Sequence, residues 1–164
     1  MNEQLVERYY QDIFHYTYFL VGNRERAEDL TQDAFVKALN SQKRPNDEIE
    51  LKKWLITIAK NTVYDAFKRD RILKFIQFDF SKSQKAVSNY EPENWVQTNE
   101  ETLQLYKAIG QLPMDYRQAI ILRKIEGFSI KETADILKWN ESKVKNATER
   151  GLKKLAELIG RDDR

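Results

Sequence analysis

The sequence of 164 residues has no cysteine, one histidine, three prolines and five glycines. The absence of cysteine excludes disulfide bonds and thiolate metal sites, and it is typical of a reducing compartment such as the cytoplasm. Few glycines and prolines leave long stretches without turn-forming residues, which favours helices over a many-turned β fold. No apolar run approaches the roughly 18 residues that span a bilayer, and the first residues are polar and acidic, unlike a signal peptide. We therefore expect an all-α, cytoplasmic protein that does not insert into a membrane.

The sequence also lacks the patterns of catalytic and cofactor sites. It has no P-loop, no glycine-rich phosphate cradle and no cluster with metal-ligand spacing. Asp29 and Asp33 could in principle share a metal, but such i, i+4 carboxylate pairs are common on helices. His15 lies among aromatic residues, which favours a core or interface position over a functional one. We expect no enzymatic activity, cofactor, metal or small-molecule substrate.

The charged residues nearly balance, with 28 Lys and Arg against 26 Asp and Glu. A net charge of +2 is too small to predict nucleic-acid binding, so only local patches are informative. Residues 138–154 form such a patch, with six Lys or Arg and two Glu.

Residues 129–155 predict a helix-turn-helix. Ser129 followed by Glu132 is a capping box that starts one helix. A short connection at residues 138–140 ends in Asn140, a favourable N-cap for a second helix. That helix can bury Val144, Ala147, Thr148, Leu152 and Leu155. Its opposite face carries Ser142, Lys145, Asn146, Glu149, Arg150 and Lys153, at helical spacing.

This face suits a DNA major groove, because Arg can bond guanine and Asn can bond adenine in pairs of hydrogen bonds. The alternative is an amphipathic surface helix with solvated charges. Two capped helices joined by a short turn favour DNA binding.

The chain divides into three parts. Residues 1–73 predict three helices, residues 74–100 a linker, and residues 101–164 a four-helix domain that contains the helix-turn-helix. The first helix should end near Gly22, and the third should run from about Glu50 to Asp70. The linker carries scattered aromatic residues that either pack locally or dock on a partner: Phe75, Phe78, Phe80, Tyr90 and Trp95. Its last part, residues 91–100, is a possible short helix.

Each N-terminal helix has an expected buried face. These faces are Leu5, Tyr9, Ile13, Tyr16 and Leu20 in the first helix; Ala27, Leu30, Ala34, Ala38 and Leu39 in the second; and Leu51, Trp54, Leu55, Ile58, Ala59, Thr62 and Ala66 in the third.

Two polar faces remain on these helices. The second helix carries an acidic and amide stripe that repels DNA and suits a basic or polar protein: Glu25, Glu28, Asp29, Gln32 and Asp33. The alternative is a solvated stripe stabilised by Arg24, Arg26 and Lys37. The third helix presents cations beside base-reading groups, a mixture that suits single-stranded DNA: Thr57, Lys60, Asn61, Tyr64, Lys68 and Arg71.

Three blocks, in order, carry a family resemblance. They are residues 27–35, residues 54–65, and residues 112–117 continuing through Gly127-Phe128-Ser129 to Val144-Lys145 and Arg150-Gly151. Together they resemble the extracytoplasmic-function (ECF) class of bacterial sigma factors, the promoter-specificity subunits of RNA polymerase. The run from Gly127 to Ala134, with Glu-Ser-Lys-Val-Lys at residues 141–145, resembles the sigma-X branch of Bacillus-type bacteria.

The resemblance implies a role for each face. The first block implies contact with the beta and beta-prime subunits of core polymerase through Glu28, Asp29, Gln32 and Asp33. The second implies binding of the minus-10 promoter element by Lys53, Thr57, Lys60, Asn61, Tyr64 and Lys68, with Lys52 beside the strand and Asn61 by the pocket for a flipped base. The third implies binding of the minus-35 element by Ser142, Lys143, Lys145, Asn146, Glu149, Arg150 and Lys153. Many members have Gly-Thr at residues 142–143, so the preferred minus-35 sequence stays open.

The family is also commonly held inactive by an anti-sigma factor, often a membrane-bound one. Two other functions fit the residues themselves. One is a helix-turn-helix regulator that binds operators as a dimer, and the other is a helical adaptor that binds only proteins.

Overall fold

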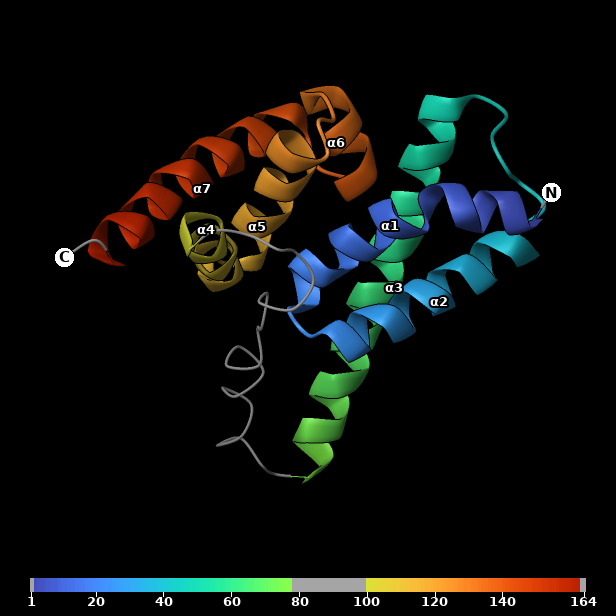
Figure 1. Ribbon diagram of the computed structural model, residues 1–164, viewed down its shortest axis with the longest axis horizontal. Coiled ribbons are helices and arrows are strands. Elements are labelled where there is room, and N and C mark those ends of the chain that lie inside the picture. Colours follow the sequence, from blue (N-terminus) through green and yellow to red (C-terminus); the bar gives the residue numbers. More distant parts are fainter. Residues whose placement is uncertain (1, 78–99, 163–164) are drawn as a thin grey trace. The chain divides into compact units, whose positions relative to one another are not determined.

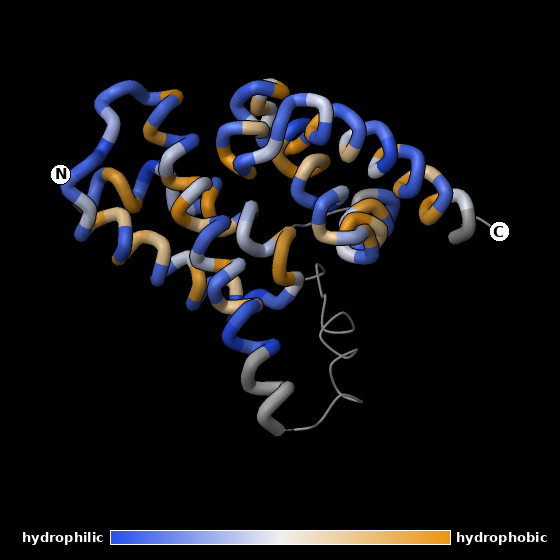
Figure 2. The backbone as a smooth tube through the Cα atoms, turned by 180° about the vertical axis from the view of Figure 1, so that it is seen from behind, coloured by the Kyte–Doolittle hydropathy of each residue, from blue (hydrophilic) through white to orange (hydrophobic). Residues whose placement is uncertain are grey.

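The computed structural model describes residues 2–77 and 100–162, and these residues form helices without strands (Figure 1). The chain divides into two compact units, residues 1–90 and residues 91–164. Hydrophobic residues recur at intervals along each helix between hydrophilic ones (Figure 2), as expected for helices that each bury one face. The expected all-α fold is confirmed.

The N-terminal unit packs three helices around one core: α1 (Asn2–Val21), α2 (Arg24–Asn40) and α3 (Glu48–Gln77). Gly22 takes a φ of 71° between α1 and α2, a conformation that costs glycine little. The Asn23 side chain then caps α2 by accepting a 2.9 Å hydrogen bond from the Arg26 backbone N–H. The stop and the cap predicted at these two residues are confirmed.

The buried faces of α1 and α2 largely follow the prediction. All five predicted residues of α1 are buried, and so are the four predicted residues of α2 other than Leu39, which is half-buried. Aromatic rings fill the space between these helices: the Tyr10 ring centroid lies 6.2 Å from that of Phe14 on α1 and 6.0 Å from that of Phe35 on α2. The pKa of His15 is lowered, mainly by burial and against the opposing effect of Asp12.

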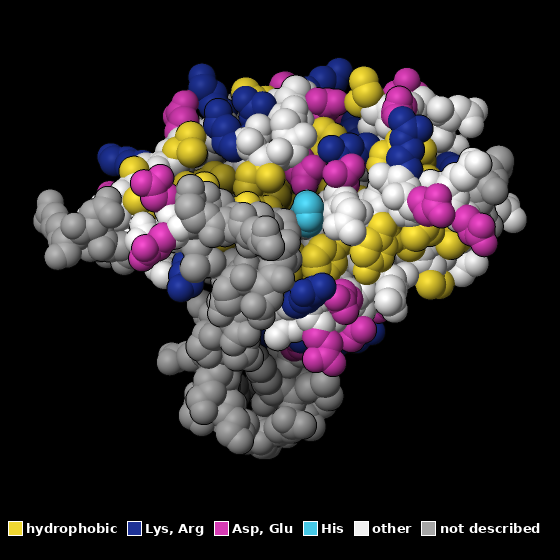
Figure 3. Space-filling view, in the orientation of Figure 1, with side chains coloured by type: hydrophobic (Ala, Val, Ile, Leu, Met, Phe, Trp, Pro, Cys, Tyr) yellow, Lys and Arg dark blue, Asp and Glu magenta, His cyan; other side chains and the backbone are white. Residues whose placement is uncertain are grey.

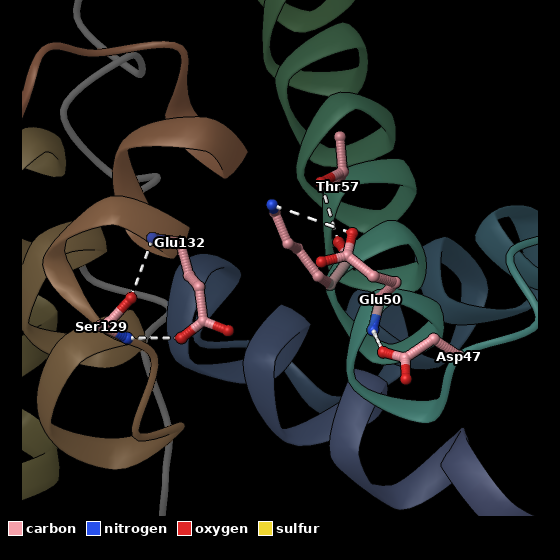
Figure 4. A network of polar contacts seen from close by, with 6 residues as sticks. Asp47, Glu50, Thr57, Ser129 and Glu132 are labelled. Carbon is pink, nitrogen blue, oxygen red and sulfur yellow. Dashed lines mark hydrogen bonds and ion pairs between the residues drawn. The ribbon is translucent and has the colours of Figure 1, made fainter.

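Helix α3 is longer than predicted. The Asp47 carboxylate accepts a 3.0 Å hydrogen bond from the Glu50 backbone N–H and starts the helix (Figure 4). The helix continues to Gln77, so the predicted end at Asp70 is wrong, and the first residues of the predicted linker are helical. The remaining linker residues, including most of its aromatics and the possible helix before Glu100, lie outside the described residues.

The buried face of α3 is also wider than predicted. Ile56, Lys60 and Val63 are buried in addition to Leu55, Ala59, Thr62 and Ala66, whereas Leu51, Trp54 and Ile58 are half-buried. Arg26 of α2 pairs with Asp70 of α3, and its guanidinium lies 5.9 Å from the Phe67 ring centroid. Helix α3 thus packs against both α1 and α2.

The C-terminal unit contains α4 (Glu100–Gln111), α5 (Met114–Ile120), a π-helical turn η3 (Ile121–Ile125), α6 (Ile130–Leu137) and α7 (Glu141–Asp162). Arg117 donates from one guanidinium nitrogen to the carbonyls of Gly110 at 2.6 Å and Leu112 at 3.1 Å, which satisfies the end of α4. Gly127, at a φ of 78°, ends the segment before the helix-turn-helix.

Within the described ranges, no helix is long and apolar enough to cross a membrane. The same residues contain no group of three or more acidic, histidine or cysteine side chains that could hold a metal ion.

Candidate polymerase and nucleic-acid interfaces

The acidic stripe of α2 lies on the surface. Glu25, Asp29, Gln32 and Asp33 are exposed, and Glu28 is half-buried. In the N-terminal unit, acidic side chains gather over α2 beside the hydrophobic surface between α1 and α2 (Figure 3). Burial raises the pKa of the Tyr10 hydroxyl, and the negative charge of the half-buried Glu28 raises it further.

The cations near this stripe mostly face elsewhere. Arg26 pairs with Asp70, and the Lys37 ammonium donates a 3.1 Å hydrogen bond to the Thr62 hydroxyl, so both side chains turn toward α3. Arg24 pairs with Glu28 at 3.2 Å. Within residues 2–77 and 100–162, Asp29 and Asp33 take part in no ion pair. The observed pairing therefore gives little support to a stripe neutralised by its own neighbours.

Val36 extends the same face and was not anticipated from the sequence. It lies three residues after Asp33 and seven after Asp29, which places it on their side of the helix. Its side chain is 57% exposed. The sequence signal was an apolar residue at helical spacing within a polar stripe. The surface is thus acidic and amide-bearing with an apolar end.

The outward face of α3 is narrower than predicted, because Lys60 is only 4% exposed. Its ammonium lies 5.8 Å from the centroid of the half-buried Tyr64 ring. The prediction that Lys60 is exposed on the DNA-facing surface is wrong. The physical reason is that both neighbouring helices pack on this part of α3, so the buried sector takes in position 60 as well as positions 56, 59 and 63.

The other predicted residues of α3 divide by exposure. Asn61, Lys68 and Arg71 are exposed, and Lys52, Thr57 and Tyr64 are half-buried. The Thr57 hydroxyl donates a 2.8 Å hydrogen bond to the Lys53 carbonyl. Lys53 is half-buried, and its ammonium lies 4.0 Å from the Glu50 carboxylate (Figure 4). Thr57, Asn61, Tyr64 and Lys68 follow one another at i, i+4, i+7 and i+11, so they share one face.

The helix-turn-helix forms as predicted. The Ser129 backbone N–H donates to the Glu132 carboxylate at 2.8 Å, and the Glu132 backbone N–H donates to the Ser129 hydroxyl at 3.0 Å (Figure 4). Lys138, with a φ of 58°, reverses the chain after α6. The Asn140 side chain then caps α7 by accepting a 2.7 Å bond from the Lys143 backbone N–H.

Helix α7 separates a buried face from a polar one. Val144, Ala147, Thr148 and Leu155 are buried as expected, but Leu152 is 39% exposed, so its predicted burial is wrong. Gly151 is buried instead, one residue around the helix, against α5. All seven predicted minus-35 residues of α7 are exposed: Ser142, Lys143, Lys145, Asn146, Glu149, Arg150 and Lys153.

The two units match separate family models. Residues 5–72 match sigma-70 region 2, and residues 102–155 match sigma-70 region 4. The structure resembles the sigma factor RpoE from Bartonella quintana, solved in complex with the anti-sigma factor NepR, with a TM-score of 0.76 at 26% identity and 96% of each chain covered.

Sequence relatives with curated names point to the same family. The chain is 32% identical to the ECF RNA polymerase sigma factor SigX of Bacillus subtilis over 92% of its own length and 79% of that protein. It is 30% identical to the RNA polymerase sigma factor YlaC of the same organism, over 90% and 86%. These identities lie too close together to select the sigma-X branch. The two matched regions, in order, together with the similarity to an ECF sigma factor over most of both chains, show that the chain belongs to the ECF family of RNA polymerase sigma factors.

Proposed function

We propose that the chain divides the work of an ECF sigma factor among three helix faces. The α2 face binds the beta and beta-prime subunits of core polymerase, the α3 face takes the opened minus-10 strand, and the α7 face reads the minus-35 duplex. The supporting observation is the segregation of exposed chemistry, with carboxylates and amides on α2 and Lys, Asn and Arg on α7. Like charges repel, so the α2 face is unsuited to DNA and suited to protein.

The α2 contact combines charge with an apolar anchor. Glu28, Asp29, Gln32 and Asp33 supply acceptors for basic or polar groups, and the exposed Val36 supplies surface that gains from being covered. Val36→Asp should therefore weaken core binding without unfolding the helix, because the side chain is already solvated in the free protein.

The minus-10 face comprises Lys53, Thr57, Asn61, Tyr64 and Lys68, and Lys60 supports it from inside. An exposed amide and an aromatic ring beside cations can hold an unpaired base and its phosphates. The minus-35 face comprises Ser142, Lys145, Asn146, Glu149, Arg150 and Lys153, where Arg and Asn can bond base edges and Lys can hold phosphates.

The chain acts in the cytoplasm, needs no cofactor and catalyses no reaction of its own. Because the Bartonella RpoE was solved with an anti-sigma factor bound, an anti-sigma factor is also expected to hold this chain inactive.

The experiment is transcription by purified core polymerase on a library of promoter fragments, with and without this chain, followed by sequencing of the transcripts. New transcripts from a shared promoter pattern are expected only when the chain is present. A stand-alone regulator would instead bind duplex specifically without polymerase, and an adaptor would produce no promoter-directed transcripts.

A further inference from the structure

Lys143 has two partners within its own unit. Its ammonium nitrogen lies 4.2 Å from the centroid of the Trp139 ring and 3.5 Å from the Asp115 carboxylate. Trp139 stands in the turn of the helix-turn-helix, Asp115 in the first turn of α5, and Lys143 in the first turn of α7. One ammonium group therefore joins three segments.

The backbone around this contact is also fixed. The Trp139 N–H donates to the Ala134 carbonyl at 3.0 Å, and the Lys143 N–H donates to the Asn140 side chain at 2.7 Å. The lysine and aspartate side chains are 49% and 56% exposed, so solvent weakens their attraction. The stacking on Trp139 adds a second contact that does not depend on a carboxylate.

We propose that Lys143 is a positioning residue for minus-35 readout, and that it orients the first turns of α7 instead of binding a DNA phosphate. The inference rests on the proposed function of α7. Asn146 and Arg150 lie three and seven residues beyond Lys143, on the same side of the helix. A change in the angle of α7 displaces both from the base edges, where hydrogen bonds tolerate little misplacement.

Charge also favours this role. If Lys143 turned to a phosphate, it would leave the Asp115 carboxylate without its cation near the negative backbone of the DNA. That juxtaposition of like charges is unfavourable. Lys145 and Lys153, which form no ion pair within the described parts of the chain, can bind phosphates without this loss.

The test compares binding of the complete holoenzyme to two duplexes over a series of salt concentrations. One duplex carries a minus-35 element selected from a random pool by the wild-type holoenzyme, and the other carries a scrambled element. Lys143→Met keeps the aliphatic part of the side chain but removes the ammonium, and with it both the ion pair and the attraction to the Trp139 ring. Lys153→Met is the matched control on the same helix.

Lys143→Met is expected to lower the ratio of the two affinities roughly three- to tenfold, as for the loss of one exposed ion pair and its stacking, with the wild-type salt slope. Asp115→Asn should lower the same ratio, because Lys143 loses the ion pair that holds the first turn of α7 to α5. The loss of a carboxylate near DNA raises both affinities alike and so leaves the ratio unchanged. Lys143→Arg should preserve the ratio. Lys153→Met should lower both affinities equally and reduce the slope by about 0.9.

A reduced salt slope in Lys143→Met, with equal loss on both duplexes, would make Lys143 a phosphate contact and overturn the proposal. An unchanged ratio in Lys143→Met would also overturn it. If Asn146→Ala and Lys153→Met leave binding unchanged as well, α7 does not read DNA, and the proposed function itself fails.

Discussion

Gly151 of α7 lies so close to Ile120 of α5 that a Cβ atom on the glycine would stand 2.8 Å from Cδ1 of the isoleucine. The same atom would meet Cγ1 of Ile120 and Cβ of Tyr116 at 3.2 Å each. Ile120 is buried and Tyr116 Cβ adjoins the backbone, so neither can move aside freely. The helix that carries the proposed DNA-reading face is thus seated on α5 through a glycine.

Gly151→Ala is expected to destabilise the C-terminal unit by about 1–2 kcal/mol, because overpacking outweighs the better helix propensity of alanine. Amide hydrogen exchange in α5 and α7 measures the change. Gly160→Ala is the matched control on the same helix, since its Cβ would meet nothing within 4 Å. This control should leave stability unchanged or raise it by up to about 1 kcal/mol. Equal effects of the two substitutions would show that the packing at Gly151 is not restrictive.

Asp33→Arg is expected to weaken binding to core polymerase by a few kcal/mol, because reversing a charge in a desolvated contact places like charges together. The Asp33 side chain is exposed, so the fold should persist, as circular dichroism would show. Binding is measured by titrating labelled chain with core enzyme. Glu7→Arg makes the same charge change at an exposed position of α1 and should leave affinity unchanged. A similar affinity for both variants would remove the α2 face from the polymerase contact.

Asn61→Ala and Lys60→Met should have different consequences, although the residues are adjacent. Asn61 is exposed, so its loss should leave core binding and closed complexes normal but slow promoter opening. Lys60 is buried beside Tyr64, so its loss should mainly alter stability and leave the salt slope of DNA binding unchanged. Permanganate footprinting of unpaired thymines reports opening, and urea denaturation reports stability. Normal opening by Asn61→Ala would refute its role.

Arg150→Ala and Asn146→Ala test readout of the minus-35 element. If the side chain contacts a base, its removal should weaken binding to the preferred minus-35 sequence by about 1–3 kcal/mol. It should also abolish the preference for one base at a single base pair. We expect this result for Asn146. Arg150 contacts either a base or a phosphate. If it contacts a phosphate, Arg150→Ala should lower the affinity for all sequences and reduce the salt slope of binding by about 0.9. Holoenzyme binding to single-base variants at two salt concentrations distinguishes them.

The stability of the N-terminal unit should depend on pH through His15. Burial lowers the pKa of His15 below its ordinary value of 6.5, so the unfolded chain binds more protons than the folded chain as the pH falls through this range. The stability that neutral His15 contributes to the folded unit is fully present above about pH 6.5. It is lost as the pH falls through the lowered pKa of the folded state. His15→Gln should flatten this dependence in urea denaturation between pH 7.5 and 5.5. An equally steep dependence in the variant would assign it to other groups.

The sequence by itself determined the local features, because these depend on residues a few positions apart. The stop at Gly22, the caps at Asn23, Ser129 and Asn140, and the polar face of α7 all follow from hydrogen bonds and periodicity within single helices. The family could also be predicted from the sequence, because the three motif blocks occur in order and each keeps its local spacing.

Tertiary structure decided what depends on neighbouring helices. Periodicity assigns one buried side to a helix, but α3 packs against both α1 and α2, so Lys60 is buried although its residue type suggested exposure. Leu152 is exposed and Gly151 buried because α7 meets α5 at the glycine. Likewise, nothing in the sequence indicates that Lys143 has an ion-pair partner. Its contact with Asp115, 28 residues earlier in the chain, exists only once α5 and α7 have packed together.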